Sequence, residues 1–268
     1  MENLQSDHLD TQNLYRDMQK RTGGEIYIGV VGPVRTGKST FIKRFMDVAV
    51  LPYMEDAAQK TRAQDELPQS AGGRTITTTE PKFIPQEAVE LKLAGEVTIR
   101  VRLVDCVGFM VEGAAGHLEN GAERLVKTPW YDHEIPFTQA AELGTRKVIT
   151  DHSTIGVVVT TDGSFSDLPQ ETYLDAENQA ISELKKLHKP FLVLVNSSHP
   201  SSRTAREAAE RIEKQHSVAA MPVNCAQLSE EDIRQIMEQI LYEFPVSRVE
   251  FSMPKWVEML PFSHPLKT

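Results

Sequence analysis

Residues 32–39 read Gly-Pro-Val-Arg-Thr-Gly-Lys-Ser and match the pattern G-x-x-x-x-G-K-[ST] at all four fixed positions. An apolar, β-branched run over residues 26–31 precedes them, and apolar residues recur at helical spacing from Ser39 to about Val50. A glycine-rich turn between a buried strand and a helix is the context in which this pattern binds phosphate. Backbone N–H groups and the positive end of the helix converge there, so the run predicts a nucleoside triphosphate site.

The pattern also predicts what individual residues of this loop do. We expect Lys38 to reach the β- and γ-phosphates and the Ser39 hydroxyl to ligate Mg²⁺. Arg35 has two interpretations of equal weight, as a solvent-facing loop residue or as a positive charge near the β/γ bridge. The candidate nucleotide-contacting residues of the loop are Gly32, Pro33, Val34, Arg35, Thr36, Gly37, Lys38, Ser39 and Thr40.

Composition bounds the class of protein. The 268 residues are enough for one large α/β domain, or for one domain with an appendage. A formal net charge of −9 argues against a nucleic-acid partner, and no run approaches the ~20 apolar residues that span a bilayer. The polar N-terminus does not resemble a secretory signal, and two cysteines, Cys106 and Cys225, fit a reducing compartment better than a disulfide framework. We therefore expect a soluble, intracellular protein.

A predicted hairpin places a second motif near the loop. Residues 89–93 and 97–103 alternate between apolar and polar side chains on either side of a short turn. The second strand leads into Asp105-Cys106-Val107-Gly108. A phosphate-binding loop followed by a hairpin that delivers D-x-x-G resembles the translation-factor-like branch of P-loop NTPases, which holds most small GTPases. In that branch Asp105 would hold Mg²⁺ through water and the Gly108 N–H would contact the γ-phosphate. The alternative for Asp105 is a plain strand-end turn residue.

The rest of the chain alternates strands and helices, which predicts a mostly parallel sheet with helices on both faces. Residues 1–22 are expected to form a polar, helical extension, residues 23–245 the P-loop domain, and residues 246–268 the start of a following region with one extra strand. Ser229 is the expected N-cap of the last helix. The expected strands span 154–160, 191–195 and about 218–223, and the expected helices 137–151, 175–187, 204–215 and 230–244.

Two long stretches, residues 52–74 and 109–136, are predicted to be irregular. They flank the positions at which NTPases of this branch carry their switch segments, and long structureless connections in compact domains are more often functional or disordered than incidental. We therefore expect both to be functional, because each begins or ends at nucleotide-contacting residues.

The base-recognition segment departs from that of a GTPase. After the strand at 191–195 the chain reads Asn196-Ser197-Ser198-His199 in place of Asn-Lys-x-Asp. Asn196 remains a candidate nucleotide contact, but the acceptor for guanine is absent, which favours adenine or poor base selectivity. The residue after Gly108 is Phe109 rather than a water-orienting glutamine, which predicts slow turnover. Water would then be positioned by residues 75–79 or by a neighbouring subunit.

Several longer runs are similar to the stage IV sporulation protein A family of endospore-forming bacteria, and the resemblance extends over about residues 21–244. The matching runs are 29–43 (GVVGPVRTGKSTFIK), 62–71 (RAQDELPQSA), 78–83 (TTEPKF), 102–108 (RLVDCVG), 128–131 (TPWY), 144–149 (GTRKVI) and 152–158 (HSTIGVV).

The resemblance implies an ATPase that uses ATP and Mg²⁺ to self-assemble into the basement layer of the spore coat, on the forespore surface in the mother-cell cytoplasm. It implies as partners further copies of itself, other coat proteins and, through a C-terminal region absent here, a small amphipathic membrane-surface peptide. The chain looks like the N-terminal nucleotide-binding portion of such a protein. Thr78 and Thr79 align with threonines that couple ATP to assembly, and Thr79 is a candidate Mg²⁺ ligand.

The expected catalytic set is therefore Lys38, Asp105, Thr78, Thr79 and Arg35, and the expected metal ligands are Ser39, Thr79 and Asp105. Two alternatives stay open. One is a regulatory GTPase, which His199 and the net acidity disfavour. The other is a nucleotide-binding scaffold without significant turnover, which Phe109 permits.

Overall fold

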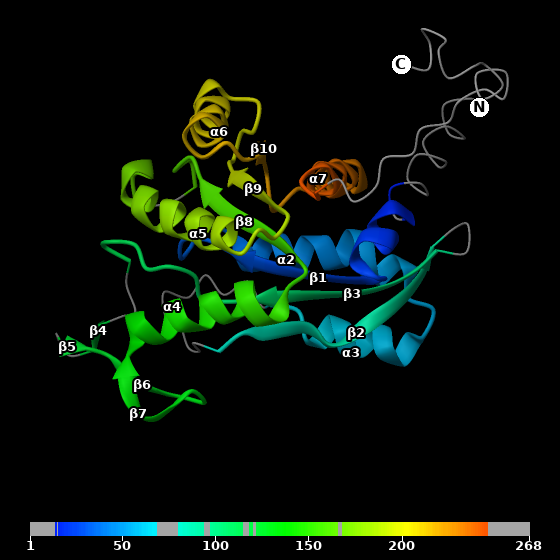
Figure 1. Cartoon of the computed structure of the whole chain (residues 1–268), viewed down its shortest axis with the longest axis horizontal. Helices are drawn as coiled ribbons and strands as arrows, with labels where there is room; N and C mark the ends of the chain where they lie inside the picture. Colours follow the sequence, from blue (N-terminus) through cyan, green and yellow to red (C-terminus); the bar gives the residue numbers. More distant parts are fainter. Residues whose placement is uncertain are drawn as a thin grey trace, which may run out of the picture.

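A six-stranded sheet forms the centre of the molecule (Figure 1), in the order β10-β9-β8-β1-β3-β2. The computed structural model describes residues 14, 16–68, 80–93, 97–114, 118–119, 122–165 and 168–245. All neighbouring strands pair in parallel except β2, which pairs antiparallel with β3 at one edge. The strands are β1 (Glu25–Val31), β2 (Lys82–Leu93), β3 (Val97–Asp105), β8 (Ile155–Thr161), β9 (Phe191–Asn196) and β10 (Ala220–Val223). The predicted mostly parallel sheet with one antiparallel hairpin strand is confirmed.

Helices cover both faces of this sheet, as predicted. On one face α2 and α7 pack over residues such as Ile28 and Leu194, with Phe41 and Ile236 in the shared core. On the other face α5 and α6 pack over Val158 and its neighbours in a second core. The helices are α2 (Lys38–Phe45), α3 (Ala57–Asp65), α4 (Phe137–Lys147), α5 (Leu174–Lys186), α6 (Arg203–His216) and α7 (Glu230–Tyr242). Residues 16–22 are also helical.

Local sequence explains where the predicted elements lie. Every residue of β8 is buried, which fits its continuous apolar and β-branched run. Ser229 caps α7 in a reciprocal capping box with Asp232, as its position before an acidic first turn predicts. The predicted helices 39–50 and 137–151 end in single π-helical turns, Met46–Val50 and Val148–His152. Short 3₁₀ turns occupy Leu51–Tyr53 and Gln170–Tyr173.

The prediction that residues 52–74 are irregular is wrong, because α3 lies inside them. Ala63 is the buried residue of this helix, so the helix lacks the apolar stripe from which helices are predicted. The Asp56 carboxylate caps its first turn through the Ala58 and Gln59 N–H groups. The remainder of this stretch from residue 69 onward lies outside the described residues.

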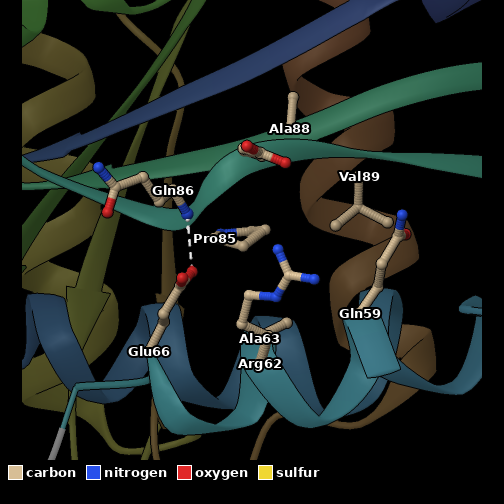
Figure 2. Close-up of a pocket in the computed structure, with 9 residues that line it drawn as sticks. Gln59, Arg62, Ala63, Glu66, Pro85, Gln86, Ala88 and Val89 are labelled. Carbon is tan, nitrogen blue, oxygen red and sulfur yellow. Dashed lines mark hydrogen bonds between the residues drawn. The ribbon is translucent and has the colours of Figure 1, made fainter. Parts of the chain in front are cut away.

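A cavity of about 260 Å³ lies between α3 and the edge strand β2 (Figure 2). The Gln86 N–H donates to the Glu66 carboxylate across it at 2.7 Å. This contact lies beside an irregularity in the β2–β3 register between Ile84 and Val89. The cavity is lined by none of the predicted nucleotide-contacting residues.

The prediction that residues 109–136 are irregular is also wrong. This stretch contains two small antiparallel hairpins, which pair β4 (Leu118–Glu119) with β5 (Ala122–Glu123) and β6 (Leu125–Thr128) with β7 (Tyr131–Pro136). The β6–β7 hairpin extends away from the central sheet beside the start of α4 (Figure 1). Its side chains are mostly exposed, so no apolar alternation marks it in the sequence.

The expected turn at residues 94–96 and the extra strand after residue 246 lie outside the described residues. Both cysteines are buried and free. Within the part of the chain that the structure describes, no helix is long and apolar enough to cross a membrane.

Candidate functional site

The loop of residues 32–39 lies at the carboxyl end of β1, between β3 and β8 in the sheet. Gly32 and Gly37 have φ angles of 130° and 97°, a region that glycine alone adopts readily. A side chain on Gly32 would collide with the Val159 carbonyl of β8. The Thr36 hydroxyl fixes the loop to the same strand, since it lies 2.6 Å from the Val159 carbonyl oxygen. The sheet therefore holds the loop rigidly in place.

Asn196, at the end of β9, joins this loop to the loop that follows β10. Its Nδ2 donates to the Thr36 carbonyl at 3.0 Å, and its Oδ1 accepts the Cys225 N–H at 3.0 Å. The side chain is buried. Asn196 thus lies beside the glycine loop and links it to the loop after β10, while its contact with nucleotide stays a prediction.

Lys38 opens α2 and is 5% exposed. Its ammonium donates to the Pro33 carbonyl of the same loop at 2.6 Å. Burial lowers the pKa of Lys38, because a desolvated ammonium is less stable, although the nearby Cys106 and Asp105 side chains oppose the shift. A phosphate anion bound in the loop would supply the charge partner that this desolvated lysine favours.

Ser39 and Asp105 meet although 66 residues separate them in sequence. The Ser39 Oγ donates to the Asp105 Oδ2 at 2.8 Å, and the Cys106 N–H donates to Oδ1 at 2.9 Å. Burial raises the pKa of Asp105, and the hydrogen bond from Ser39 opposes that shift. A hydroxyl beside a carboxylate at the start of the P-loop helix is the arrangement that binds Mg²⁺ on a triphosphate. The structure therefore brings two of the three predicted metal ligands together.

A metal held in this way would take most of its ligands from phosphates and water. In the described portion of the chain, no group of three or more His, Cys, Asp or Glu side chains could hold a metal ion. Mg²⁺ keeps several waters and uses one or two protein ligands beside the phosphates. The third predicted ligand, Thr79, lies outside the described residues, as does Thr78.

The segment after Asp105 is bonded to the glycine loop along its backbone. The Phe109 N–H donates to the Gly32 carbonyl at 3.0 Å, and the Phe109 carbonyl accepts the Val34 N–H at 2.9 Å. The Phe109 side chain is fully buried in the second core. It cannot orient a water molecule at the phosphates, which agrees with the departure from glutamine seen in the sequence.

The Gly108 N–H has a partner that the sequence did not predict. It donates at 3.2 Å to the hydroxyl of Thr145, a buried residue of α4. Thr145 lies in the run GTRKVI, which was singled out by resemblance alone. Its position beside Gly108 depends on packing between residues 37 positions apart, so no local pattern could reveal it.

The loops after β9 and β10 lie where the nucleotide base is expected. Two of their backbone N–H groups are bonded to side chains of the same loop. The His199 N–H donates to the Ser197 Oγ at 3.0 Å, and the Ala226 N–H donates to the Asn224 Oδ1 at 3.0 Å. A cavity of about 560 Å³, lined in part by Asp162, Ser197 and His199, lies between the loops after β8 and β9. Arg35, within the glycine loop, is exposed and has a φ of 62°. Its exposure leaves both interpretations of this residue open.

A glycine loop between the central strand and its helix, with a buried lysine and a hydroxyl–carboxylate pair, defines a P-loop nucleotide-binding protein of mixed α/β fold. Residues 9–245 match a family described as "Stage IV sporulation protein A, ATPase domain". The chain belongs to the stage IV sporulation protein A family, and the resemblance seen in the sequence is confirmed.

Three relatives named stage IV sporulation protein A illustrate this membership. The chain is 49% identical to that of Clostridioides difficile (strain 630) over 96% of its length, 44% identical to that of Bacillus anthracis over 97%, and 45% identical to that of Bacillus subtilis (strain 168) over 97%. It spans about half of each relative, 52% of the first and 53% of the other two.

Among solved structures, the chain is similar to a crystal structure of a variant of SsGBP. The TM-score is 0.45 and the sequence identity 13%, over 88% of this chain and 64% of that one. A likeness of that size supports no argument about function.

Proposed function

We propose that this chain is an ATP- and Mg²⁺-dependent ATPase domain whose slow turnover drives self-assembly into the basement layer of the spore coat. The assembly would form on the forespore surface, in the mother-cell cytoplasm. One observation carries the nucleotide part of the proposal: the Ser39–Asp105 pair lies at the start of α2, next to a buried Lys38. Assembly and location rest on membership of the stage IV sporulation protein A family.

The topology favours the GTPase-like branch of P-loop NTPases. Strand β3 lies directly beside β1 and is the return strand of an antiparallel hairpin. It therefore delivers Asp105 to the end of the glycine loop, and Gly108 follows at the turn. Phe109, buried and bonded to the loop, favours slow hydrolysis, because the residue at this position cannot activate water.

Adenine is the base that these loops favour. At position 199 the chain has histidine, not the carboxylate that accepts hydrogen bonds from guanine. The Ala226 N–H, from the neighbouring loop, is donated within its own loop to Asn224. Without a carboxylate at position 199, the site lacks the acceptor with which GTPases of this branch select guanine.

Phosphate release from ATP and from GTP, measured at matched concentrations in the presence of Mg²⁺, tests the proposal. We expect slow, Mg²⁺-dependent release from ATP that exceeds release from GTP. Faster release from GTP would instead support a regulatory GTPase. Tight ATP binding without release under assembly conditions would support a nucleotide-binding scaffold.

Asp105→Asn is expected to reduce Mg²⁺-dependent hydrolysis by about 10²-fold or more and to weaken ATP binding far less. The carboxylate acts on the metal and its water shell, while the backbone N–H groups of the loop still hold the phosphates. Turnover and equilibrium binding are measured on the same protein. Asp151→Asn, a change of an exposed carboxylate paired with Lys147, is the matched control. Equal losses of binding and turnover would point to a structural role at the end of β3.

The double variant Thr78→Ala/Thr79→Ala is expected to bind ATP with near-normal affinity but to lose coupling to hydrolysis or assembly. In this NTPase branch a threonine before the hairpin contacts Mg²⁺ and senses the γ-phosphate, and its release signals hydrolysis. ATP binding, phosphate release and light scattering would be measured in the full-length protein. Wild-type hydrolysis and assembly by the double variant would refute this assignment and leave these threonines as strand-forming residues.

We assign separate roles to the segments of this chain and to the part of its relatives that it does not span. Residues 23–245 would form the ATPase domain, with the helical residues before it as an extension. Partners other than further copies of the chain, namely coat proteins and a small amphipathic membrane-surface peptide, would bind the part of the family's length that this chain does not span.

A further inference from the structure

The Gly108 N–H, which would contact the γ-phosphate, is occupied by a side chain of α4. It donates to the Thr145 Oγ1 at 3.2 Å, and the Thr145 hydroxyl donates in turn to the Ala141 carbonyl at 2.8 Å. Gly108 and Thr145 are both buried. A buried N–H group needs a partner, and here the partner belongs to a helix rather than to the phosphate-binding loop.

A γ-phosphate oxygen and the Thr145 hydroxyl therefore compete for one donor, because one N–H makes one strong hydrogen bond. We propose that Thr145 is a latch that holds α4 against Gly108 until the γ-phosphate of the nucleotide displaces it. This inference rests on the proposed function, since it requires a triphosphate in the loop. It goes beyond that function by naming Thr145 as the residue through which the γ-phosphate acts on the rest of the domain. Thr145 is a positioning residue in this scheme and touches no reacting atom.

Of the two partners, Gly108 is the one that the neighbouring backbone bonds hold to the glycine loop. Gly108 is followed by Phe109, whose backbone makes two hydrogen bonds with the glycine loop and whose side chain is fully buried. Thr145 contributes a single side-chain bond to Gly108. When a γ-phosphate takes the Gly108 N–H, the glycine stays with the loop and the helix loses its contact.

The response of α4 reaches the β6–β7 hairpin. The Phe137 N–H at the start of α4 donates to the Arg124 carbonyl at 2.8 Å, and the Arg124 guanidinium lies over the Phe137 ring at 5.1 Å. The helix contacts both strands of the hairpin, so they are expected to move together. The hairpin projects from the domain (Figure 1) and exposes Leu125 by 57% and Tyr131 by 41%. Its orientation would thus report whether the γ-phosphate is present.

Thr145→Val tests the latch, because valine keeps the shape of threonine and removes the hydroxyl. In the nucleotide-free and ADP-bound states the Gly108 N–H then lacks its acceptor, whereas in the ATP-bound state the phosphate supplies one. The ratio of ATP to ADP affinity should rise roughly tenfold, which corresponds to about 1.4 kcal/mol. Thr145→Ser keeps the hydroxyl and should preserve the wild-type ratio within about twofold.

Trp130, in the turn between β6 and β7, provides a second readout. The chain has two tryptophans, so Trp256→Phe leaves Trp130 as the single emitter. In this background ATP should change the emission and ADP should not, and Thr145→Val should resemble the ATP-bound protein before nucleotide is added. The comparison of ATP with ADP in this background keeps Thr145, and so it remains decisive if Thr145→Val does not fold.

The outcomes separate the latch from the function on which it rests. If the wild-type chain binds neither ATP nor ADP, the proposed function fails and the latch fails with it. If both nucleotides bind, an unchanged affinity ratio in folded Thr145→Val overturns the latch alone. Identical Trp130 emission with ATP and with ADP overturns it in the same way.

Discussion

Replacement of Lys38 by alanine is expected to lower ATP affinity by about 10²-fold or more, while the domain keeps its fold. The ammonium is nearly inaccessible to water and donates to the Pro33 carbonyl of its own loop. Burial lowers the pKa of Lys38, so the charge is costly without an anion beside it. Charge-assisted hydrogen bonds to phosphate contribute several kcal/mol, and alanine removes all of them at once.

The fold should tolerate this change, because alanine removes a desolvated charge together with one hydrogen bond. Alanine is also favourable at a helix start. Lys43→Ala, an exposed residue of the same helix, is the matched control and should bind ATP normally. Calorimetric titration and thermal unfolding measure the two properties separately. A folded Lys38→Ala protein with near-normal ATP affinity would remove the basis for the nucleotide site.

Gly32→Ala is expected to destabilise the domain by about 2–5 kcal/mol, even without nucleotide. The added Cβ would collide with the Val159 carbonyl, and the φ of 130° is strained for any other residue. Val159 belongs to a fully buried central strand, so it cannot move aside. The glycine is thus required by packing between the loop and β8, and not only by the approach of phosphate.

Gly23→Ala separates the two causes of lost stability, the collision of the added Cβ and the positive φ of the backbone. Gly23 also has a positive φ, 67°, but among the described residues no atom lies within 4 Å of the position of its added Cβ. Its substitution should cost about 1 kcal/mol. Urea unfolding of both variants without nucleotide gives the comparison. Equal losses of stability would mean that the contact with Val159 relaxes and that conformation alone sets the cost.

The sequence predicted those parts of the fold whose signals are local. Continuous apolar runs marked β8 and β9, and a serine before an acidic turn marked the start of α7. Helix α3 was missed because it is held by an Asp56 cap and contributes Ala63 to the core, so its sequence reads as polar. The β6–β7 hairpin was missed because its side chains are mostly exposed.

The residues of the candidate site also include some that the sequence predicts and one that it does not. The glycine loop, Lys38 and Ser39 follow from one short pattern, and Asp105 follows from its place after a hairpin strand. The structure places the Ser39 Oγ 2.8 Å from the Asp105 Oδ2, and the role of both residues as metal ligands stays a prediction. Thr145 could not be predicted, because α4 carries it to Gly108 only through tertiary packing. The exposed Arg35 keeps both of its interpretations, and the roles of Thr78 and Thr79 stay predictions.

Competition between ATP and GTP for the purified chain, followed by equilibrium titration in Mg²⁺, tests the central claim most directly. The claim is that residues 32–39 bind a triphosphate whose base is adenine. We expect ATP to bind at least about tenfold more tightly than GTP, because position 199 offers no carboxylate to guanine. Tighter binding of GTP, or failure of both nucleotides to bind, would contradict this account.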